Sequence, residues 1–132
     1  MRFLVVDDNE IIRRSLIRVI ESHGEAECAE AIDGKEAVEK SLNWKPDLIL
    51  LDVRLPELSG FEAARIIRKN QPDIRILFCS IYDTPDVMQE AKLIGDGFLL
   101  KEEIVETLPH AIGAVARKEQ FFPADSQPEP GT

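Results

Sequence analysis

The chain lacks a concentrated block of lysine and arginine, and it lacks an apolar stretch long enough to cross a bilayer. Its 132 residues include 25 acidic and 16 basic side chains, which gives a formal net charge of -9. Because such a surface repels phosphate backbones, we expect no direct DNA binding by this chain. The first apolar run, residues 3–6, is only long enough for a strand, so neither a secretion signal nor a membrane span is expected.

Cysteine is scarce, and one nucleotide-binding motif is missing. No glycine-rich loop ending in Lys-Ser or Lys-Thr is present, which excludes a P-loop nucleotide binder. The two cysteines, Cys28 and Cys79, lie in apolar, strand-like runs, where a free thiol behaves as a small buried hydrophobe. Unpaired structural cysteines are typical of the cytoplasm, which is the compartment that we expect.

The residues that are present fit one ordinary domain in which apolar runs alternate with helical patterns five times. We expect strands at residues 3–6, 25–31, 47–51, 75–79 and 97–100. We expect helices after Asn9, over residues 35–43, 61–69 and 85–93, and from Thr107 onward. Alternation with short connections predicts parallel strands, so the expected fold is α/β, a doubly wound (βα)5 flavodoxin-like sheet with strand order 2-1-3-4-5.

Two local details of the helices are also predicted. Asp33 and Gly34 indicate a turn, and the helix after them is expected to direct Ala37, Val38 and Leu42 toward the core.

The end of the chain is expected to be the least regular part. Pro109 cannot donate an amide hydrogen bond, so we place the last helix after Thr107 as N-cap, with the proline in its first turn, and expect a short helix. The residues that follow are rich in Pro, Asp, Ser and Glu. We therefore expect one domain over residues 1–118 and a flexible tail or truncated interdomain linker over residues 119–132.

Three of the apolar runs end in charged side chains. FLVVDD ends at Asp7 and Asp8, DLILLD ends at Asp52, and GFLLK ends at Lys101. The carboxyl ends of parallel strands meet at one edge of an open α/β sheet, where ligands bind. Clustered carboxylates there need a cation, and hard oxygen ligands suit Mg²⁺. Taken singly, an acidic pair after a strand is more often a solvated turn and helix N-terminus, and such a lysine is more often a surface residue.

Together with Ser80 at the end of ILFCS, these residues resemble the site of the receiver domain of two-component response regulators. The resemblance implies a signalling domain, not an enzyme beyond its own phosphorylation and dephosphorylation, with Asp52 as the phosphoacceptor. It implies that Asp8, Asp52 and the backbone carbonyl of Arg54 bind Mg²⁺ directly and that Asp7 holds it through water. A Mg²⁺-dependent phosphatase is disfavoured, because Arg54 stands where such enzymes carry a second aspartate.

The resemblance also implies how the site acts. Lys101 pairs with Asp52 at rest and contacts a phosphoryl oxygen afterwards, while the Ser80 hydroxyl donates to another oxygen. Phe98, three residues before the lysine, then rotates into the space that Ser80 vacates. The surface that partners read is formed by the fourth helix, the fifth strand and the fifth helix.

The partner implied by the resemblance is a sensor histidine kinase or a phosphotransfer protein, which supplies the phosphoryl group. A phosphorylation-dependent homodimer is expected either through the fourth helix, fifth strand and fifth helix or through the first and fifth helices. A receiver-like docking domain that is never phosphorylated is disfavoured, because all five charged or hydroxyl-bearing site positions are present.

Three residues beside the site are predicted to modulate turnover. Ile81 stands where receivers often have a small alanine, so access to the acyl phosphate is expected to be narrower and its loss slower. Arg54 and Tyr82 flank the route of the hydrolytic water in this fold and are expected to slow its entry further.

The segments LLDVRLPELSG, CSIYD, GFLLKEE and HAIGAVARKEQFF are similar to receivers of the NarL/LuxR type. In that type a linker after the last helix leads to a helix-turn-helix DNA-binding domain, which is not among these residues. We therefore expect an output in transcription through an effector domain absent from this chain. Whether the chain is a fragment of a longer regulator or a stand-alone receiver stays open at this point.

Overall fold

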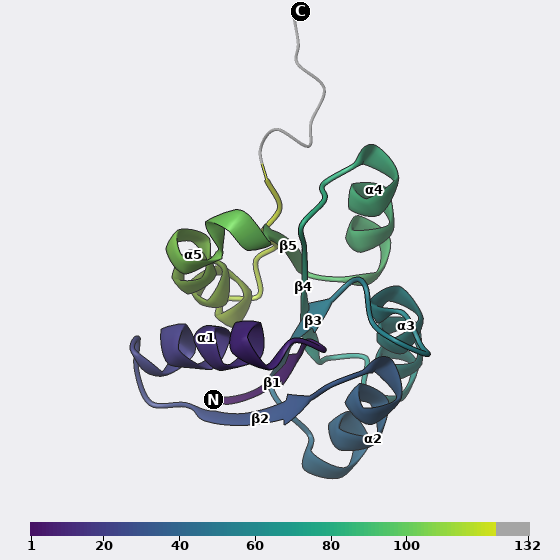
Figure 1. The fold of residues 1–132 in the computed structure, drawn as a ribbon, viewed down its shortest axis with the longest axis horizontal. Helices are drawn as coiled ribbons and strands as arrows, with labels where there is room; N and C mark the ends of the chain where they lie inside the picture. The colour runs from purple at the N-terminus through teal and green to yellow at the C-terminus, as the bar shows by residue number, and fades with distance from the viewer. Residues whose placement is uncertain (124–132) are drawn as a thin grey trace, which may run out of the picture.

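The computed structural model describes residues 1–123 and contains one parallel sheet between two layers of helices (Figure 1). Its strands lie in the order β2-β1-β3-β4-β5, and every pairing is parallel, which confirms the predicted flavodoxin-like fold. The strands are β1 Arg2–Val6, β2 Glu27–Ala31, β3 Leu48–Asp52, β4 Arg75–Ser80 and β5 Gly97–Leu100. The helices are α1 Glu10–Glu21, α2 Gly34–Trp44, α3 Gly60–Asn70, α4 Pro85–Ile94, the 3-10 helix η1 Lys101–Glu103 and α5 Ile104–Ala116.

The sheet is buried on both faces because alternate residues of its central strands enter two separate apolar cores. Leu48 and Leu50 of β3 pack in the core under α1 and α5. Ile49 and Leu51 pack in the core under α2, α3 and α4. All four are fully buried, which is why this strand appears in the sequence as a continuous apolar run.

Side-chain caps fix the starts of the helices that follow the strands. Asn9 Oδ1 accepts a hydrogen bond from the Ile12 amide at 3.0 Å, so Asn9 caps α1 as predicted. Asp33 Oδ1 accepts one from the Glu36 amide at 2.8 Å. The Asp33-Gly34 pair, predicted as a turn, is therefore the N-terminus of α2, because aspartate is favoured at an N-cap as well as in turns.

α2 differs from the predicted burial at one residue. Ala37 is fully buried and Val38 is partly buried, but Leu42 is 43% exposed, so its inward placement was wrong. Ser41 is buried in its place and accepts a hydrogen bond from Gln71 Nε2 at 2.7 Å. A polar side chain with a buried partner can occupy the core side of a helix, and an apolar periodicity does not reveal it.

The last helix begins earlier and is longer than predicted. α5 follows η1 directly, and the Thr107 hydroxyl donates to the Glu103 carbonyl at 2.9 Å instead of capping the helix. Pro109 lies inside the helix, where it removes one backbone hydrogen bond. The burial of Leu108 and Ala111 beside it offsets this loss, since tertiary packing supplies most of the stability of a short helix.

The chain turns back after α5 and returns to the sheet. The Phe121 amide donates to the Asp96 carbonyl at 2.9 Å, and the Phe121 carbonyl accepts from the Phe98 amide at 2.9 Å. Phe121, which lies in the segment predicted as a flexible tail or truncated interdomain linker, is therefore held on β5, because the outer edge of that strand offers unpaired backbone groups. The rest of that predicted segment, residues 124–132, lies outside the described residues.

Arg68 fastens the end of α3 to the end of α4. Its Nη2 donates to the Ile94 carbonyl at 2.9 Å and to Asp96 Oδ2 at 3.1 Å. At the other end of α4, Thr84 is the N-cap residue, but its side chain makes no capping hydrogen bond. The C-terminal end of α4 is therefore attached more firmly than its N-terminal end.

Both cysteines are free and lie on β2 and β4, which are not neighbouring strands. Burial, followed by the charge of Asp52, raises the pKa of the Cys79 thiol. Burial, followed by the charges of Glu21 and Glu30, raises the pKa of the half-buried Cys28 thiol to about 11. Both thiols therefore remain protonated near neutral pH and serve in packing.

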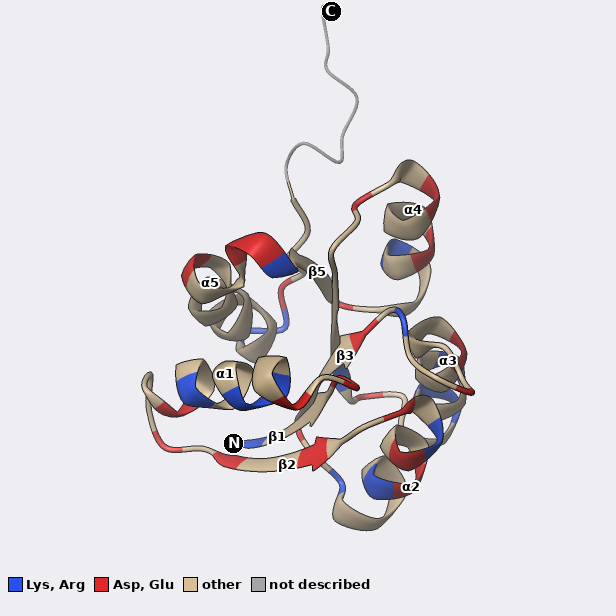
Figure 2. Ribbon diagram, viewed as in Figure 1, with Lys and Arg blue, Asp and Glu red and all other residues tan. Residues whose placement is uncertain are grey.

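Charges of both signs are distributed over the helices (Figure 2). In this view basic residues follow one another along the middle of α1, with acidic residues near its two ends, and both signs appear on α2 and α3. Among the described helices, none has both the length and the apolar character needed to cross a membrane.

Candidate functional site

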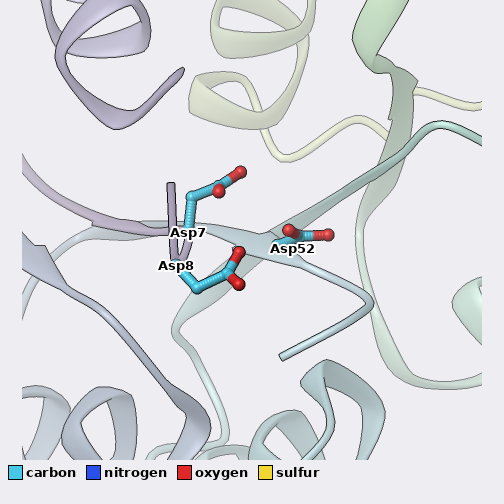
Figure 3. Close-up of side chains that lie close together, drawn as sticks. All are labelled: Asp7, Asp8 and Asp52. Carbon is cyan, nitrogen blue, oxygen red and sulfur yellow. The ribbon is translucent and has the colours of Figure 1, made fainter. Parts of the chain in front are cut away.

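Three carboxylates gather at the carboxyl edge of the sheet. Asp7 and Asp8 follow β1, and Asp52 is the last residue of the neighbouring β3. Figure 3 shows all three side chains projecting toward the same side. One carboxylate oxygen from each lies within 4.8 Å of the others. Asp7 and Asp52 are buried and Asp8 is exposed, so the cluster runs from the interior of the protein to its surface.

Lys101 reaches the cluster from the end of β5. Its Nζ donates a hydrogen bond to Asp52 Oδ2 at 2.8 Å and lies 2.8 Å from Asp7 Oδ2. The lysine side chain is only 16% exposed, so solvent screens these two ion pairs weakly. The structure thus brings together the four charged residues that end the apolar runs of the sequence.

The Asp7 carboxylate is oriented by its own loop but is not fully satisfied. Its Oδ1 accepts a hydrogen bond from the Asn9 amide at 2.9 Å. Its buried Oδ2 lies 2.8 Å from Lys101 Nζ as an ion pair without good hydrogen-bond alignment, and no other donor reaches it among the described residues. A buried oxygen in this state is costly, and a cation or a water bound to one would satisfy it.

Arg13, which the sequence patterns did not single out, holds the main chain at Asp7. From α1 its Nη1 donates to the Asp7 carbonyl at 2.9 Å, and its Nε donates to Glu30 Oε1 on β2 at 2.7 Å. The only signal in the sequence was an arginine beside the apolar stripe of α1. Glu30 lies 17 positions away along the chain, and no sequence pattern connects the two.

The electrostatics of the site make one carboxyl easy to protonate. Burial raises the pKa of Asp52 to about 6, although the hydrogen bond and charge of Lys101 lower it; the charge of Asp7 raises it further. Burial lowers the pKa of Lys101, but the hydrogen bond to Asp52 and the charges of Asp52 and Asp7 outweigh this and raise it above its usual value. The lysine therefore stays charged at neutral pH.

Ser80 lies at the end of β4 and Phe98 lies within β5, as the sequence predicts. Ser80 is the buried last residue of β4, the strand next to β3, and its Oγ accepts a hydrogen bond from the Tyr82 amide at 3.0 Å. The hydroxyl hydrogen of Ser80 is therefore available to another acceptor. Phe98 is fully buried on β5, in the core under α2, α3 and α4.

The side chains of Arg54, Ile81 and Tyr82 line the rim beside the ends of β3 and β4. The guanidinium carbon of Arg54 lies 5.3 Å from the centroid of the Tyr82 ring, in a cation–π arrangement. The Arg54 amide donates to Asp52 Oδ1 at 3.1 Å. Ile81 is 58% exposed, so this rim presents an apolar side chain to solvent next to the acidic cluster.

The donor set of the cluster fits a hard divalent cation. Two buried carboxylates face a single ammonium group, so the interior of the site keeps a surplus negative charge. Asp8 adds a third carboxylate at the surface. Oxygen donors alone, with no nitrogen or sulfur ligand within the cluster, favour Mg²⁺ over softer metals.

Comparison with known proteins places these features in a family. Residues 3–113 match the family model of the response regulator receiver domain. The transcriptional regulatory protein YdfI of Bacillus subtilis (strain 168) is 36% identical over 118 residues, which cover 88% of this chain and 55% of YdfI. The chemotaxis protein CheY of Thermotoga maritima is 35% identical over 112 residues, which cover 81% of this chain and 93% of CheY.

The structural comparison agrees with the sequence comparison. A crystal structure of a LuxR-family two-component response regulator from Aurantimonas sp. SI85-9A1 superposes with a TM-score of 0.89 at 28% identity, covering 95% of this chain and 91% of that one. The chain spans about half the length of the first transcriptional regulators that it matches. The match to the family model runs from β1 into α5 and includes the acidic cluster, Ser80 and Lys101. The chain therefore belongs to the response regulator receiver domains of two-component systems.

Proposed function

We propose that the chain accepts a phosphoryl group on Asp52 from a phosphohistidine of a sensor histidine kinase or phosphotransfer protein, in a Mg²⁺-dependent reaction. A carboxylate oxygen of Asp52 attacks phosphorus, and an O–P bond forms as the P–N bond to the donor imidazole breaks. The proposal rests on one observation above all. Lys101 Nζ lies 2.8 Å from carboxylate oxygens of both Asp52 and Asp7, within the cluster that also contains Asp8.

The acidic cluster supplies the metal site in this proposal. When bound, Mg²⁺ screens the carboxylate from the incoming phosphoryl group and orients the two for in-line transfer. Asp8, Asp52 and the Arg54 carbonyl would bind the ion directly, and Asp7 would hold it through water. The buried Asp7 oxygen without a hydrogen bond, together with the surplus negative charge, supports this assignment.

The other site residues receive the phosphoryl group. Lys101, already charged and close to Asp52, pairs with one phosphoryl oxygen after transfer. The Ser80 hydroxyl donates to a second oxygen, since its lone pair is already engaged by the Tyr82 amide and its hydrogen is not. Ser80 and Lys101 thereby draw the ends of β4 and β5 toward the phosphoryl group, and Phe98 rotates into the space that Ser80 vacates.

The output of the proposed switch is the surface formed by α4, β5 and α5. Its effect is control of transcription through an effector domain outside this chain. The names of the relatives support this output, because several are transcriptional regulators of which the chain spans about half. Residues 1–118 form the receiver in this proposal, and residues 119–132 form the tail or interdomain linker. In this proposal the chain catalyses only its own phosphorylation and dephosphorylation.

Intact mass measurement after incubation with Mg²⁺ and acetyl phosphate tests the proposal. The wild type should gain one phosphoryl group, and Asp52→Asn should gain none. Asp73→Asn, an exposed carboxylate outside the cluster, is the matched control and should behave like the wild type. A chelator should abolish uptake. Equal uptake by Asp52→Asn, or uptake that survives the chelator, would show that the assignment is wrong.

A further inference from the structure

The chain reverses direction after α5 through a residue in the left-handed conformation. Lys118 has a φ of 64°. The amides of Lys118 and Glu119 donate to the carbonyls of Val115 and Ala114, at 3.0 and 2.9 Å. A left-handed residue just past a helix satisfies the last carbonyls and redirects the chain. Because lysine adopts this conformation less readily than glycine does, contacts made farther along must hold the reversal in place.

Those contacts are made with the outer edge of β5. The two hydrogen bonds of Phe121, to the Asp96 carbonyl and from the Phe98 amide, lie on either side of Gly97 and form a parallel bridge with it. A Cβ atom on Gly97 would lie 2.6 Å from the Phe121 oxygen and 3.3 Å from its Cβ. The missing side chain at position 97 therefore permits the close approach of the two segments.

The two aromatic rings of the returning segment enter opposite sides of the sheet. Phe121 packs against the core under α1 and α5, and Phe122 packs against the core under α2, α3 and α4, to which Phe98 belongs. Lys92 Nζ of α4 lies 5.9 Å from the centroid of the Phe122 ring. In Figure 1 the yellow end of the described chain passes beside β5 between α5 and α4. This alternation of side chains is that of a strand, although the pairing with β5 is limited to the single bridge at Gly97.

We infer that residues 119–123 form an intramolecular clasp on the outer edge of β5, and that a second copy of the chain reaches this edge only when the clasp opens. An uncovered edge strand presents unpaired amides and carbonyls to which another chain can add. Here those groups are already used by Phe121. With the clasp closed, a homodimer through α4, β5 and α5 is blocked at its central strand.

The clasp is connected to the acidic site through β5. Phe98, whose amide binds the Phe121 carbonyl, stands three residues before Lys101. In the proposed function, Lys101 moves from the Asp52 and Asp7 carboxylates to a phosphoryl oxygen, and the accompanying shift of β5 displaces the Phe98 amide from its acceptor. Phosphorylation therefore opens the clasp. This coupling, unlike the clasp itself, rests on the proposed function, and by reciprocity an open clasp favours the phosphorylated form.

Hydrogen exchange of individual amides in the full chain, measured by NMR without a phosphodonor, tests the clasp. The Phe98 amide should exchange slowly in the wild type and at least about tenfold faster in the Phe121→Ala/Phe122→Ala double variant. The Phe78 amide of β4 should stay protected in both, which shows that the fold is retained. Gln120→Ala, an exposed neighbour, is the matched control. Equally fast exchange of the Phe98 amide in wild type and double variant would refute the clasp.

A second variant should stabilise the clasp instead of opening it, and it still tests the clasp if the double variant does not fold. Lys118→Gly removes the strain of the left-handed residue, so the Phe98 amide should exchange more slowly than in the wild type. Exchange that is unchanged or faster contradicts the clasp.

The same measurement with Mg²⁺ and excess acetyl phosphate tests the coupling, while intact mass reports whether the phosphoryl group is bound. Exchange of the Phe98 amide should become faster in the phosphorylated wild type and should not change further in the double variant. A bound phosphoryl group with unchanged exchange shows that the coupling is wrong. If no phosphoryl group binds, the proposed function fails, and the measurement without a donor still decides whether the clasp exists.

Discussion

Magnesium binding should weaken in acid, because the ion and a proton compete for the Asp52 carboxylate. Burial raises the pKa of this group to about 6. With one competing proton, the apparent dissociation constant is multiplied by one plus ten to the power of the difference between pKa and pH. This factor is about 1.1 at pH 7 and about 11 at pH 5, so affinity should fall roughly tenfold between them.

The same pKa predicts the opposite trend for the stability of the metal-free protein. The pKa of Asp52 is higher in the folded state than in the unfolded chain, where it is about 3.9. Its stabilising contribution is therefore fully present below that value and is lost as the pH rises through about 6. The rise in melting temperature that saturating Mg²⁺ produces should accordingly be larger at pH 7 than at pH 5.

Isothermal titration calorimetry at pH 7 and pH 5, at constant ionic strength, measures the predicted loss of affinity. Lys101→Met is the informative comparison, because removing the ammonium group removes what lowers the pKa of Asp52 and should move the midpoint to higher pH. Equal affinity for Mg²⁺ at the two pH values would refute the reasoning about burial. A loss of affinity that is centred near pH 4 in the wild type would refute it as well.

Three further substitutions each test the contribution of one residue at or near the site. Arg13→Met removes the hydrogen bond that holds the Asp7 carbonyl and should weaken Mg²⁺ binding about tenfold by calorimetry. Gly60→Ala places a Cβ 2.1 Å from the backbone oxygen that ends β3 and should lower the free energy of unfolding in urea by about 1–3 kcal/mol. Ile81→Ala opens the rim of the site and should speed loss of the phosphoryl group, followed by intact mass over time.

Matched controls keep these three predictions specific. Arg14→Met, with a side chain 61% exposed beside Arg13, should leave the affinity for Mg²⁺ unchanged. Gly113→Ala should be tolerated, because the nearest atom to its Cβ is the end of a flexible arginine at 3.4 Å. Ile66→Ala on α3 should not alter dephosphorylation. An equal effect of a control and its partner variant would show that the loss is not local to the site.

The strands and the charged edge could be predicted because both depend on local sequence. A strand covered on both faces is a continuous apolar run, and β3 differs from its predicted bounds by one residue at each end. Once Asp7, Asp52 and Lys101 end three parallel strands, the strand order brings them to one edge of the sheet. The geometry of the cluster therefore follows from the fold without any knowledge of the loops.

The features that escaped prediction depend on contacts between distant parts of the chain. The penalty of Pro109 is local, but the burial that offsets it exists only once α5 packs on the sheet. Arg13 meets Glu30 only because α1 crosses beside β2. The composition after residue 118 suggested a solvated tail, and only the vacant edge of β5 makes Phe121 a pairing partner.

The unequal attachment of α4 determines how that helix responds to its surroundings. Arg68 donates two hydrogen bonds to the Ile94 carbonyl and so holds the C-terminal end of α4. The N-terminal end, which has no side-chain cap, is freer to move about this fixed point. Because Ser80 is joined to this freer end by residues 81–84, we expect a displacement of Ser80 to move the first turn of α4 more than its last turn. The affinity of a binding protein that contacts the first turn of α4 should therefore change most when Ser80 moves, and that of one that contacts the last turn should change least.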